Sequence, residues 1–310
     1  LIYLNGENTT TIQGFTFTGQ IGGSDWEGAL LRLNGGAKPT FRDLIIRNNI
    51  MGSSYSPEAQ IMNVRNSGTH PIFDNVYFKN NATSSTSQSR KTAFIYDNSE
   101  ADFIDCKWEG NFGWESMIRV QANSKAYFEN NVFFNNGGND WGIIEVHDNN
   151  CVITFVNSTL VNSTTGNGNL IGIGGNYNRI NFINSVLGKT SSGKQQIRNN
   201  TATTNSIFAR NSVFAYDTLS GVFYPGKLQW DVDSSMVYAD PQLNNDGTLK
   251  ANSPAIGIGT KQVVSTGISS VTPPLFDING VTRPDPAGSS PDAGAYESNM
   301  AIGDFDLILS

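Results

Sequence analysis

The sequence predicts an all-β solenoid, in which short strands wind round one axis and equivalent residues of successive coils stack. Three observations predict this fold class: a block that recurs every 25 to 32 residues, alternation of apolar and polar residues within each repeat, and a line of Asn and Asp at one repeat position. The copies of the block start at Ile12, Phe41, Phe73, Phe103, Phe128, Phe155, Phe182 and Ala209.

Each repeat contains three short alternating segments separated by Asn, Asp, Gly and Ser turns, and alternation with a period of two indicates strands. A propeller blade needs four strands and about 40 residues, and a leucine-rich repeat needs Leu at fixed spacing, so the pattern excludes both. The first segment predicts an inward column of Leu33, Val64, Tyr96, Val120, Val146 and Ile173. The second and third segments predict inward columns of Phe41, Phe73, Phe103, Phe128, Phe155 and Phe182, and of Ile46, Phe78, Trp108, Phe133, Leu160 and Leu187.

Asn is strongly enriched, with 37 residues, of which 32 precede residue 212. Seven Asn or Asp residues occupy one repeat position: Asp43, Asn75, Asp105, Asn130, Asn157, Asn184 and Asn211. A sharp corner between two strands needs a residue that tolerates the left-handed backbone region, which Asn does most readily after Gly. Stacked Asn amides can also bond one another. We therefore interpret this line as a structural corner ladder rather than as glycosylation or ligand sites.

The composition of the 310 residues limits the function classes. Charged residues are 15% and the net charge is -7, without the basic stripe that a duplex nucleic-acid binder needs. No apolar run approaches the ~18 residues of a membrane span. The two cysteines, Cys106 and Cys151, are expected to be free and buried. No zinc spacing, phosphate loop, nucleophile elbow or dinucleotide fingerprint occurs, so no metal or cofactor is expected, with calcium left open although no dense Asp cluster occurs.

The C-terminal stretch carries the motifs Asp240-Pro241, Ser253-Pro254-Ala255-Ile256, Arg283-Pro284 and Pro291-Asp292-Ala293-Gly294-Ala295-Tyr296-Glu297. It is similar to the tail of many secreted bacterial β-helix proteins, except that Gly257 stands where that tail has Asp. The coils resemble the right-handed, three-sheet parallel β-helix of the pectate-lyase-like superfamily. The resemblance implies about eight visible coils over residues 1–235, a C-terminal capping segment over 236–300, and the start of a linker or further domain over 301–310.

In the lyases and hydrolases that these coils resemble, the site lies on the outer face of one sheet, which here would carry the Leu31–Leu33 and Ile144–Val146 segments. Outward side chains there include Asp97, Arg119, Glu145 and His147, which are the candidate catalytic residues. Arg65 and Glu115, with Trp26, Trp114 and Trp141 at the edge, are candidate ligand-binding residues, because sugar rings stack on aromatic side chains. The alternative is that these Trp rings only cover an outward apolar column of Leu30, Ile61, Met117, Ile143 and Leu170.

Two functional hypotheses follow. The first is an extracellular or cell-surface segment of a larger secreted bacterial protein, attached to neighbouring domains of the same chain, that binds a polysaccharide or cell-surface glycan or acts as a rigid adhesive spacer. The second is a polysaccharide lyase, with Arg119 or His147 as the base, or a glycoside hydrolase using carboxylates such as Asp97 and Glu145. The sequence leaves open whether the protein is an enzyme.

Overall fold

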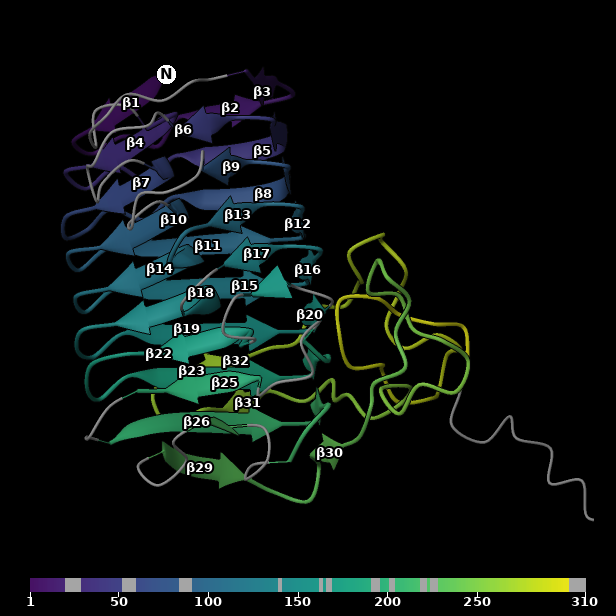
Figure 1. The fold of residues 1–310 in the computed structure, drawn as a ribbon. Helices are drawn as coiled ribbons and strands as arrows, with labels where there is room; N and C mark the ends of the chain where they lie inside the picture. Colours follow the sequence, from purple (N-terminus) through teal and green to yellow (C-terminus); the bar gives the residue numbers. More distant parts are fainter. Residues whose placement is uncertain are drawn as a thin grey trace, which may run out of the picture.

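The computed structural model is a parallel β-helix whose coils stack along one axis (Figure 1). It describes residues 1–19, 29–51, 60–83, 91–138, 141–161, 164–165, 169–190, 196–200, 204–217, 222–223 and 228–300. The all-β solenoid predicted from the repeat is confirmed. Trp26 and residues 301–310 lie outside the described part of the chain. The described residues contain no helix that could cross a membrane.

The first side of the solenoid is a nine-stranded parallel sheet, which we call sheet A. Its strands are β1 (Ile2–Asn5), β4 (Leu31–Asn34), β7 (Gln60–Arg65), β10 (Lys91–Tyr96), β14 (Ser116–Gln121), β18 (Gly142–His147), β22 (Ile171–Ile173), β25 (Ile197–Asn199) and β28 (Val222–Phe223). Each strand pairs with its equivalent in the next coil, so outward side chains form columns that cross the coils.

The second and third sides form one 16-stranded sheet, because β5 (Thr40–Arg47) and β8 (Ile72–Lys79) continue round the corner between them. The second side also contains β2 (Thr11–Gln13), β11 (Glu100–Ile104), β15 (Lys125–Glu129), β19 (Val152–Val156), β23 (Arg179–Ile183), β26 (Asn205–Arg210) and β29 (Leu228–Val232). The third side contains β3 (Thr16–Thr18), β12 (Lys107–Glu109), β16 (Val132–Phe134), β20 (Thr159–Val161), β24 (Val186–Leu187), β27 (Val213–Phe214) and β30 (Val237–Tyr238).

Three short sheets complete the described strands. Two are parallel and follow the third side: β13 (Phe112–Gly113), β17 (Gly137–Gly138) and β21 (Thr164–Thr165) form one, and β6 (Ile50–Met51) and β9 (Ala82–Thr83) form the other. The third is an antiparallel hairpin of β31 (Val264–Ser265) and β32 (Ser270–Val271) in the C-terminal segment.

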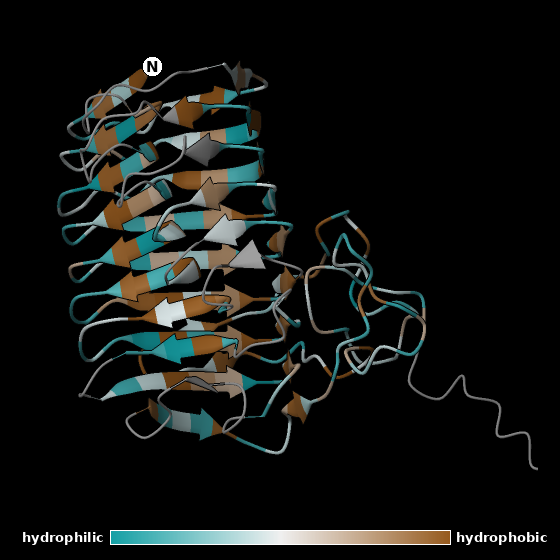
Figure 2. Ribbon diagram, in the orientation of Figure 1, coloured by the Kyte–Doolittle hydropathy of each residue, from teal (hydrophilic) through white to brown (hydrophobic). Residues whose placement is uncertain are grey.

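The core is built from the stacked columns that the repeat predicts. The six Phe rings of the second segment are fully buried and stack face to face, with neighbouring ring centroids 5.0–5.1 Å apart. The third-segment column is equally buried, with Trp108 stacked between Phe78 and Phe133. Figure 2 shows apolar residues alternating with polar ones along the strands, as expected for strands with one buried and one solvent-exposed face.

Two predicted columns are corrected. Tyr96 does not point inward; Ile95 pairs with Val64 and Val120 and fills that place, and Tyr96 pairs with Arg65. The predicted outward column of Leu30, Ile61, Met117, Ile143 and Leu170 instead belongs to the core. Its strands begin with a local irregularity, in which the Leu170 carbonyl accepts from the amides of both residues 143 and 144, so two consecutive side chains turn inward.

The corner ladder is confirmed. All seven predicted Asn and Asp residues have positive φ angles between 45° and 54°. Their side chains bond between coils, as in the 2.7 Å bond from Asn75 to Asp43 and the 2.9 Å bond from Asn130 to Asp105. A second, fully buried ladder was not predicted; it consists of Asn49, Asn81, Asn111 and Asn136.

The C-terminal segment packs beside the third side of the solenoid (Figure 1). Amides of the corner ladder donate to its backbone: Asn130 to Phe276 O, Asn184 to Thr260 O and Asn211 to Ile258 O, at 2.8–2.9 Å. These contacts run along the corner across several coils. The proposal that residues 236–300 protect the open end of the last coil stays a prediction.

Candidate functional site

The outer face of sheet A brings Arg119 and Glu145 together, as the sequence predicts. The two residues pair directly across β14 and β18, and Gln121 pairs with His147 in the same register. Going from β4 to β25, the outward position is occupied by Arg32, Asn63, Phe94, Arg119, Glu145, Gly172 and Arg198. Within this column, Arg119 on β14 and Glu145 on β18 are neighbours of opposite charge in the middle of the sheet.

Glu145 is the centre of this cluster and its side chain is fully buried. One carboxylate oxygen lies 3.1 Å from Nδ1 of His147 and 3.7 Å from Nε of Arg119, and the other accepts a 3.0 Å bond from the Ser116 hydroxyl. Burial alone would raise the pKa of Glu145, but the His147 bond and the nearby cations Arg119 and Lys91 outweigh it and lower that pKa. Glu145 is therefore ionised at neutral pH.

The ionised state of Glu145 assigns the proton on His147. A carboxylate can only accept hydrogen bonds, so the Nδ1 atom that faces Glu145 carries the proton. Nε2 of a neutral His147 then has a free lone pair, and the Asp148 carboxylate is 3.7 Å from it, outside hydrogen-bond range. The His147 side chain is 31% exposed, so part of it is open to solvent.

A second carboxylate, Glu115, completes an ion-pair network. Its oxygen lies 2.7 Å from Nζ of Lys91 and 2.9 Å from Nη1 of Arg119. Lys91 is almost fully buried, and burial lowers its pKa despite the attraction of Glu115. Sequence reasoning missed Lys91. The signal was the register of β10: once Ile95 faces inward, Lys91 falls in line with Gln60 at the start of the strand.

The Trp141 backbone passes close to Gly172 on this face. A side chain on Gly172 would come within 2.2 Å of the Trp141 carbonyl, so glycine is needed there for the Trp141 segment to cross the sheet. The indole ring stacks under the Arg198 guanidinium at 4.6 Å and meets the His147 ring edge-on at 5.9 Å. Trp141 and Trp114 are both half-buried, and Trp114 lies in the bend between β13 and β14.

The remaining candidates do not join the cluster. Asp97 is exposed and lies in the turn after β10, with a φ of 64°. Tyr96, rather than Asp97, pairs with Arg65, so Asp97 is not in the predicted outward column. Arg65 lies two coils from Arg119, with its guanidinium 5.4 Å from the Tyr96 ring centroid. The expected carboxylate pair of Asp97 and Glu145 is therefore not on one face. Among the described residues, no group of three or more His, Cys, Asp or Glu side chains is placed to hold a metal ion.

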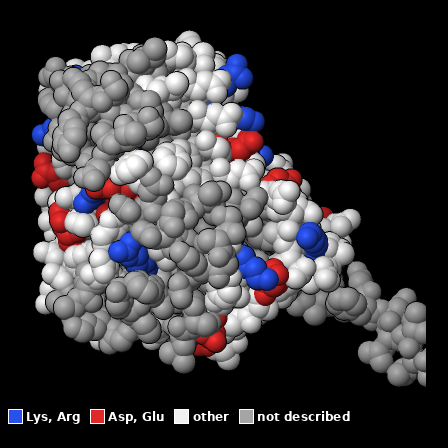
Figure 3. Space-filling model, in the orientation of Figure 1, with Lys and Arg blue, Asp and Glu red and all other residues white. Residues whose placement is uncertain are grey.

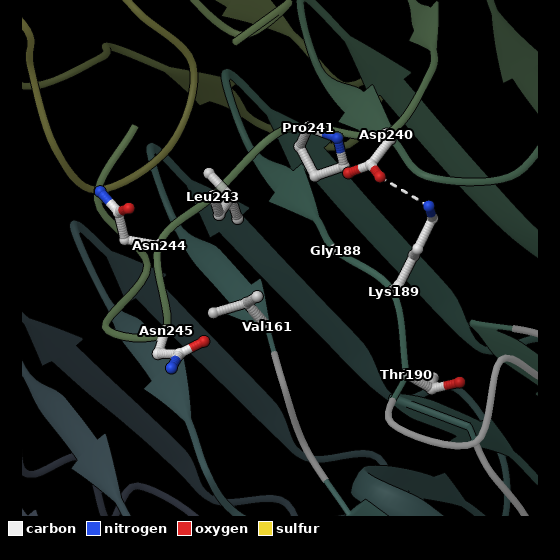
Figure 4. Close-up of a pocket in the computed structure, with 9 residues that line it drawn as sticks. All are labelled: Val161, Gly188, Lys189, Thr190, Asp240, Pro241, Leu243, Asn244 and Asn245. Carbon is white, nitrogen blue, oxygen red and sulfur yellow. Dashed lines mark hydrogen bonds and ion pairs between the residues drawn. The ribbon is translucent and has the colours of Figure 1, made fainter. Parts of the chain in front are cut away.

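A separate pocket of about 200 Å³ lies between the third side and the C-terminal segment (Figure 4). Its most polar feature is the exposed 2.5 Å ion pair of Lys189 and Asp240, and Leu243 and Val161 line its other side. On the face seen in Figure 3, the described basic and acidic residues are interspersed. The network around Glu145 differs from this pocket and from the mixed charges in Figure 3, because it combines a buried carboxylate, a partly exposed imidazole and half-buried aromatic residues.

No protein-family model, curated protein or solved structure matches this chain.

Proposed function

We propose that this protein is a secreted or cell-surface β-helix segment of a larger bacterial protein that binds a polysaccharide or cell-surface glycan on the outer face of sheet A. One observation carries the proposal: the half-buried Trp141 ring lies beside the His147 ring and the Arg198 guanidinium, and His147 contacts Glu145. A sugar ring stacks its apolar face on an aromatic side chain while its hydroxyls bond to polar groups nearby.

Binding is tested with a panel of neutral and acidic polysaccharides, including xylan, alginate and polygalacturonate, by affinity electrophoresis and calorimetry. Trp141→Ala and Trp114→Ala are each expected to weaken binding by roughly 1–2 kcal/mol, the scale of one stacked aromatic anchor. Tyr177→Ala is the matched control, since Tyr177 is an aromatic residue that is 67% exposed in a turn away from this cluster. Folded Trp variants that bind a confirmed glycan as tightly as the parent would contradict the proposal.

A second candidate, a uronate-specific polysaccharide lyase, is favoured by the contact between buried Glu145 and Nδ1 of His147. His147 Nε2 would remove the C5 proton of a uronate while the bond from C4 to the glycosidic oxygen breaks, giving a C4=C5 double bond, and the departing oxygen would take a proton from water. Arg119 would neutralise the uronate carboxylate. The lyase predicts that His147→Gln abolishes formation of unsaturated, ultraviolet-absorbing products, whereas a binding protein forms none before or after the substitution.

A further inference from the structure

The C-terminal hairpin covers part of the second side of the solenoid. Val264 and Val271 of β31 and β32 pack on a small apolar cluster formed by Val156, Ile183 and Phe208 of β19, β23 and β26. Nη2 of Arg179 donates to the Thr266 carbonyl at the hairpin turn. Apolar packing therefore holds the strands of the hairpin, and a partly buried side-chain hydrogen bond holds its turn.

A pocket of about 260 Å³ opens beside the tip of this hairpin. Ile268 and Ser269 of the turn form one wall, and the outward side chains of β11, β15 and β19 form the other. This volume lies just below the roughly 300 Å³ at which pockets for drug-sized ligands begin. The size suits a single ring with its substituents rather than an extended chain.

The strand register places charged, aromatic and hydroxyl side chains in this pocket. Glu100 pairs with Lys125 and Asp102 pairs with Tyr127, so two carboxylates, an ammonium group and an aromatic ring project from adjacent coils. Thr154 follows Tyr127 in the next coil and adds a hydroxyl. The wall thus offers hydrogen-bond acceptors, donors and an apolar ring face within one small volume.

The polar wall is held in place before any ligand arrives. The Tyr127 hydroxyl donates to Glu129 at 2.7 Å, which fixes the ring, and Lys125 lies 2.6 Å from Glu100. Nε2 of His70 lies 2.9 Å from Asp102, and the bond to Asp102 raises the pKa of His70. Such preorganised groups lose little conformational freedom when a ligand binds.

The carboxylates of this wall have basic partners. Lys125 lies against Glu100, and the two ring nitrogens of His70 face Glu100 and Asp102. A charged ligand would have to displace one of these partners, whereas a neutral polyhydroxyl ring can donate to the carboxylates and accept from Lys125. Tyr127 and Ile268, which line the pocket, supply the apolar surface that such a ring also needs.

We propose that the pocket between the β31–β32 turn and the second side of the solenoid binds a single neutral sugar residue, with Asp102 and Glu100 accepting from its hydroxyls and Tyr127 contacting its ring. This site lies on a different side of the solenoid from sheet A and is independent of the function proposed there.

The test is an NMR titration of the intact 310-residue chain with glucose, galactose, mannose and N-acetylglucosamine, following the backbone amides of residues 266–270 and 125–127. Galacturonate and ethanolamine serve as acidic and basic probes. We expect saturable shifts with at least one neutral sugar and none with the charged probes. Asp102→Asn should weaken that binding about tenfold or more, since it removes a charge-assisted hydrogen bond. Ile268→Ala, at an exposed turn position that the fold does not need, should weaken it as well.

Asp231→Asn is the matched control, because Asp231 is also an exposed carboxylate on the second side that is paired with a cation, Arg210. It should leave sugar binding unchanged, as should Trp141→Ala on sheet A. The proposal is overturned if no neutral sugar gives saturable shifts at the hairpin turn, if a charged probe binds in preference, or if both Asp102→Asn and Ile268→Ala bind like the parent. Loss of polysaccharide binding in Trp141→Ala with retained sugar shifts here would separate the two sites.

Discussion

The stacked Phe column should carry a large share of the stability of the solenoid, and Phe128 tests this at its centre. The Phe128 side chain is fully buried. Its ring stacks on Phe103 at 5.0 Å and on Phe155 at 5.1 Å, and it meets Phe133 edge-on at 5.5 Å. Substitution by Ala removes all three ring contacts and leaves a cavity inside the coil.

The expected loss follows from these contacts. Truncating a buried Phe to Ala costs about 3–5 kcal/mol from lost burial and the cavity that remains. Three aromatic neighbours, each worth about 0.5–1.5 kcal/mol beyond area, place Phe128→Ala at the upper end of that range. Phe128→Leu keeps most of the apolar volume and should cost roughly 1–2 kcal/mol. Phe15→Ala is the control, since Phe15 is 59% exposed and should change stability by less than about 0.5 kcal/mol.

The assay is equilibrium unfolding in urea, followed both by far-UV circular dichroism and by Trp fluorescence. Two probes are needed because the coils of a solenoid contact only their neighbours, so a weakened central coil can divide the transition. A loss below about 1 kcal/mol for Phe128→Ala, or one no larger than that of Phe15→Ala, would refute the conclusion that stacked rings form the core.

Three further predictions concern polar groups. Asn111→Ala removes a 2.8 Å bond to the Phe78 carbonyl and leaves the buried backbone and side-chain amides of Asn81 without their acceptor. It should therefore lower the free energy of unfolding by about 2–4 kcal/mol. A loss within about 0.5 kcal/mol in urea unfolding would contradict a stabilising role for the second, buried Asn ladder. His70 should titrate by NMR above its ordinary pKa of 6.5, chiefly because Asp102 accepts its hydrogen bond, and Asp102→Asn should lower that pKa. A raised pKa in the folded state stabilises the protein below pH 6.5, and this stabilisation is lost as pH rises through the folded value; the effect is small because the side chain is 35% exposed. A His70 pKa that Asp102→Asn leaves unchanged would exclude the pairing. Arg283→Ala leaves the buried Glu297 carboxylate, 2.8 Å away, without its cation and should lower the free energy of unfolding by about 3–5 kcal/mol in thermal or urea unfolding. The double variant Arg283→Ala/Glu297→Ala should lose less than the sum of the losses of the two single variants. Additive losses would show that the pair is not coupled.

The fold could be predicted because each coil repeats the same local requirements. A residue such as Phe128 must face its equivalents in the coils on either side, so a core position recurs as Phe in the sequence. A corner residue such as Asn157 must adopt a positive φ, and few residue types do so at low cost. Both constraints act within one coil and its neighbour, and both therefore leave a periodic trace.

The candidate site could be predicted only in part. Arg119, Glu145 and His147 stand in coils where apolar and polar residues alternate cleanly, and the structure brings them together. Asp97 was misplaced because Phe94, Ile95 and Tyr96 are all apolar, so alternation could not set their register, and a shift of one residue reverses every side chain.

The sequence alone predicted the solenoid, the inward columns of its second and third sides and its corner ladder, since these depend on periodic patterns between adjacent coils. The tertiary structure decided which polar residues share an environment. Lys91 is a buried ion-pair partner only because the start of its strand lies beside Glu115 of the next coil. Ile268, 166 residues after Asp102, borders the pocket at Asp102 only because its hairpin folds back onto the second side. Such contacts join positions with no common period, and side-chain packing and charge pairing in three dimensions select them.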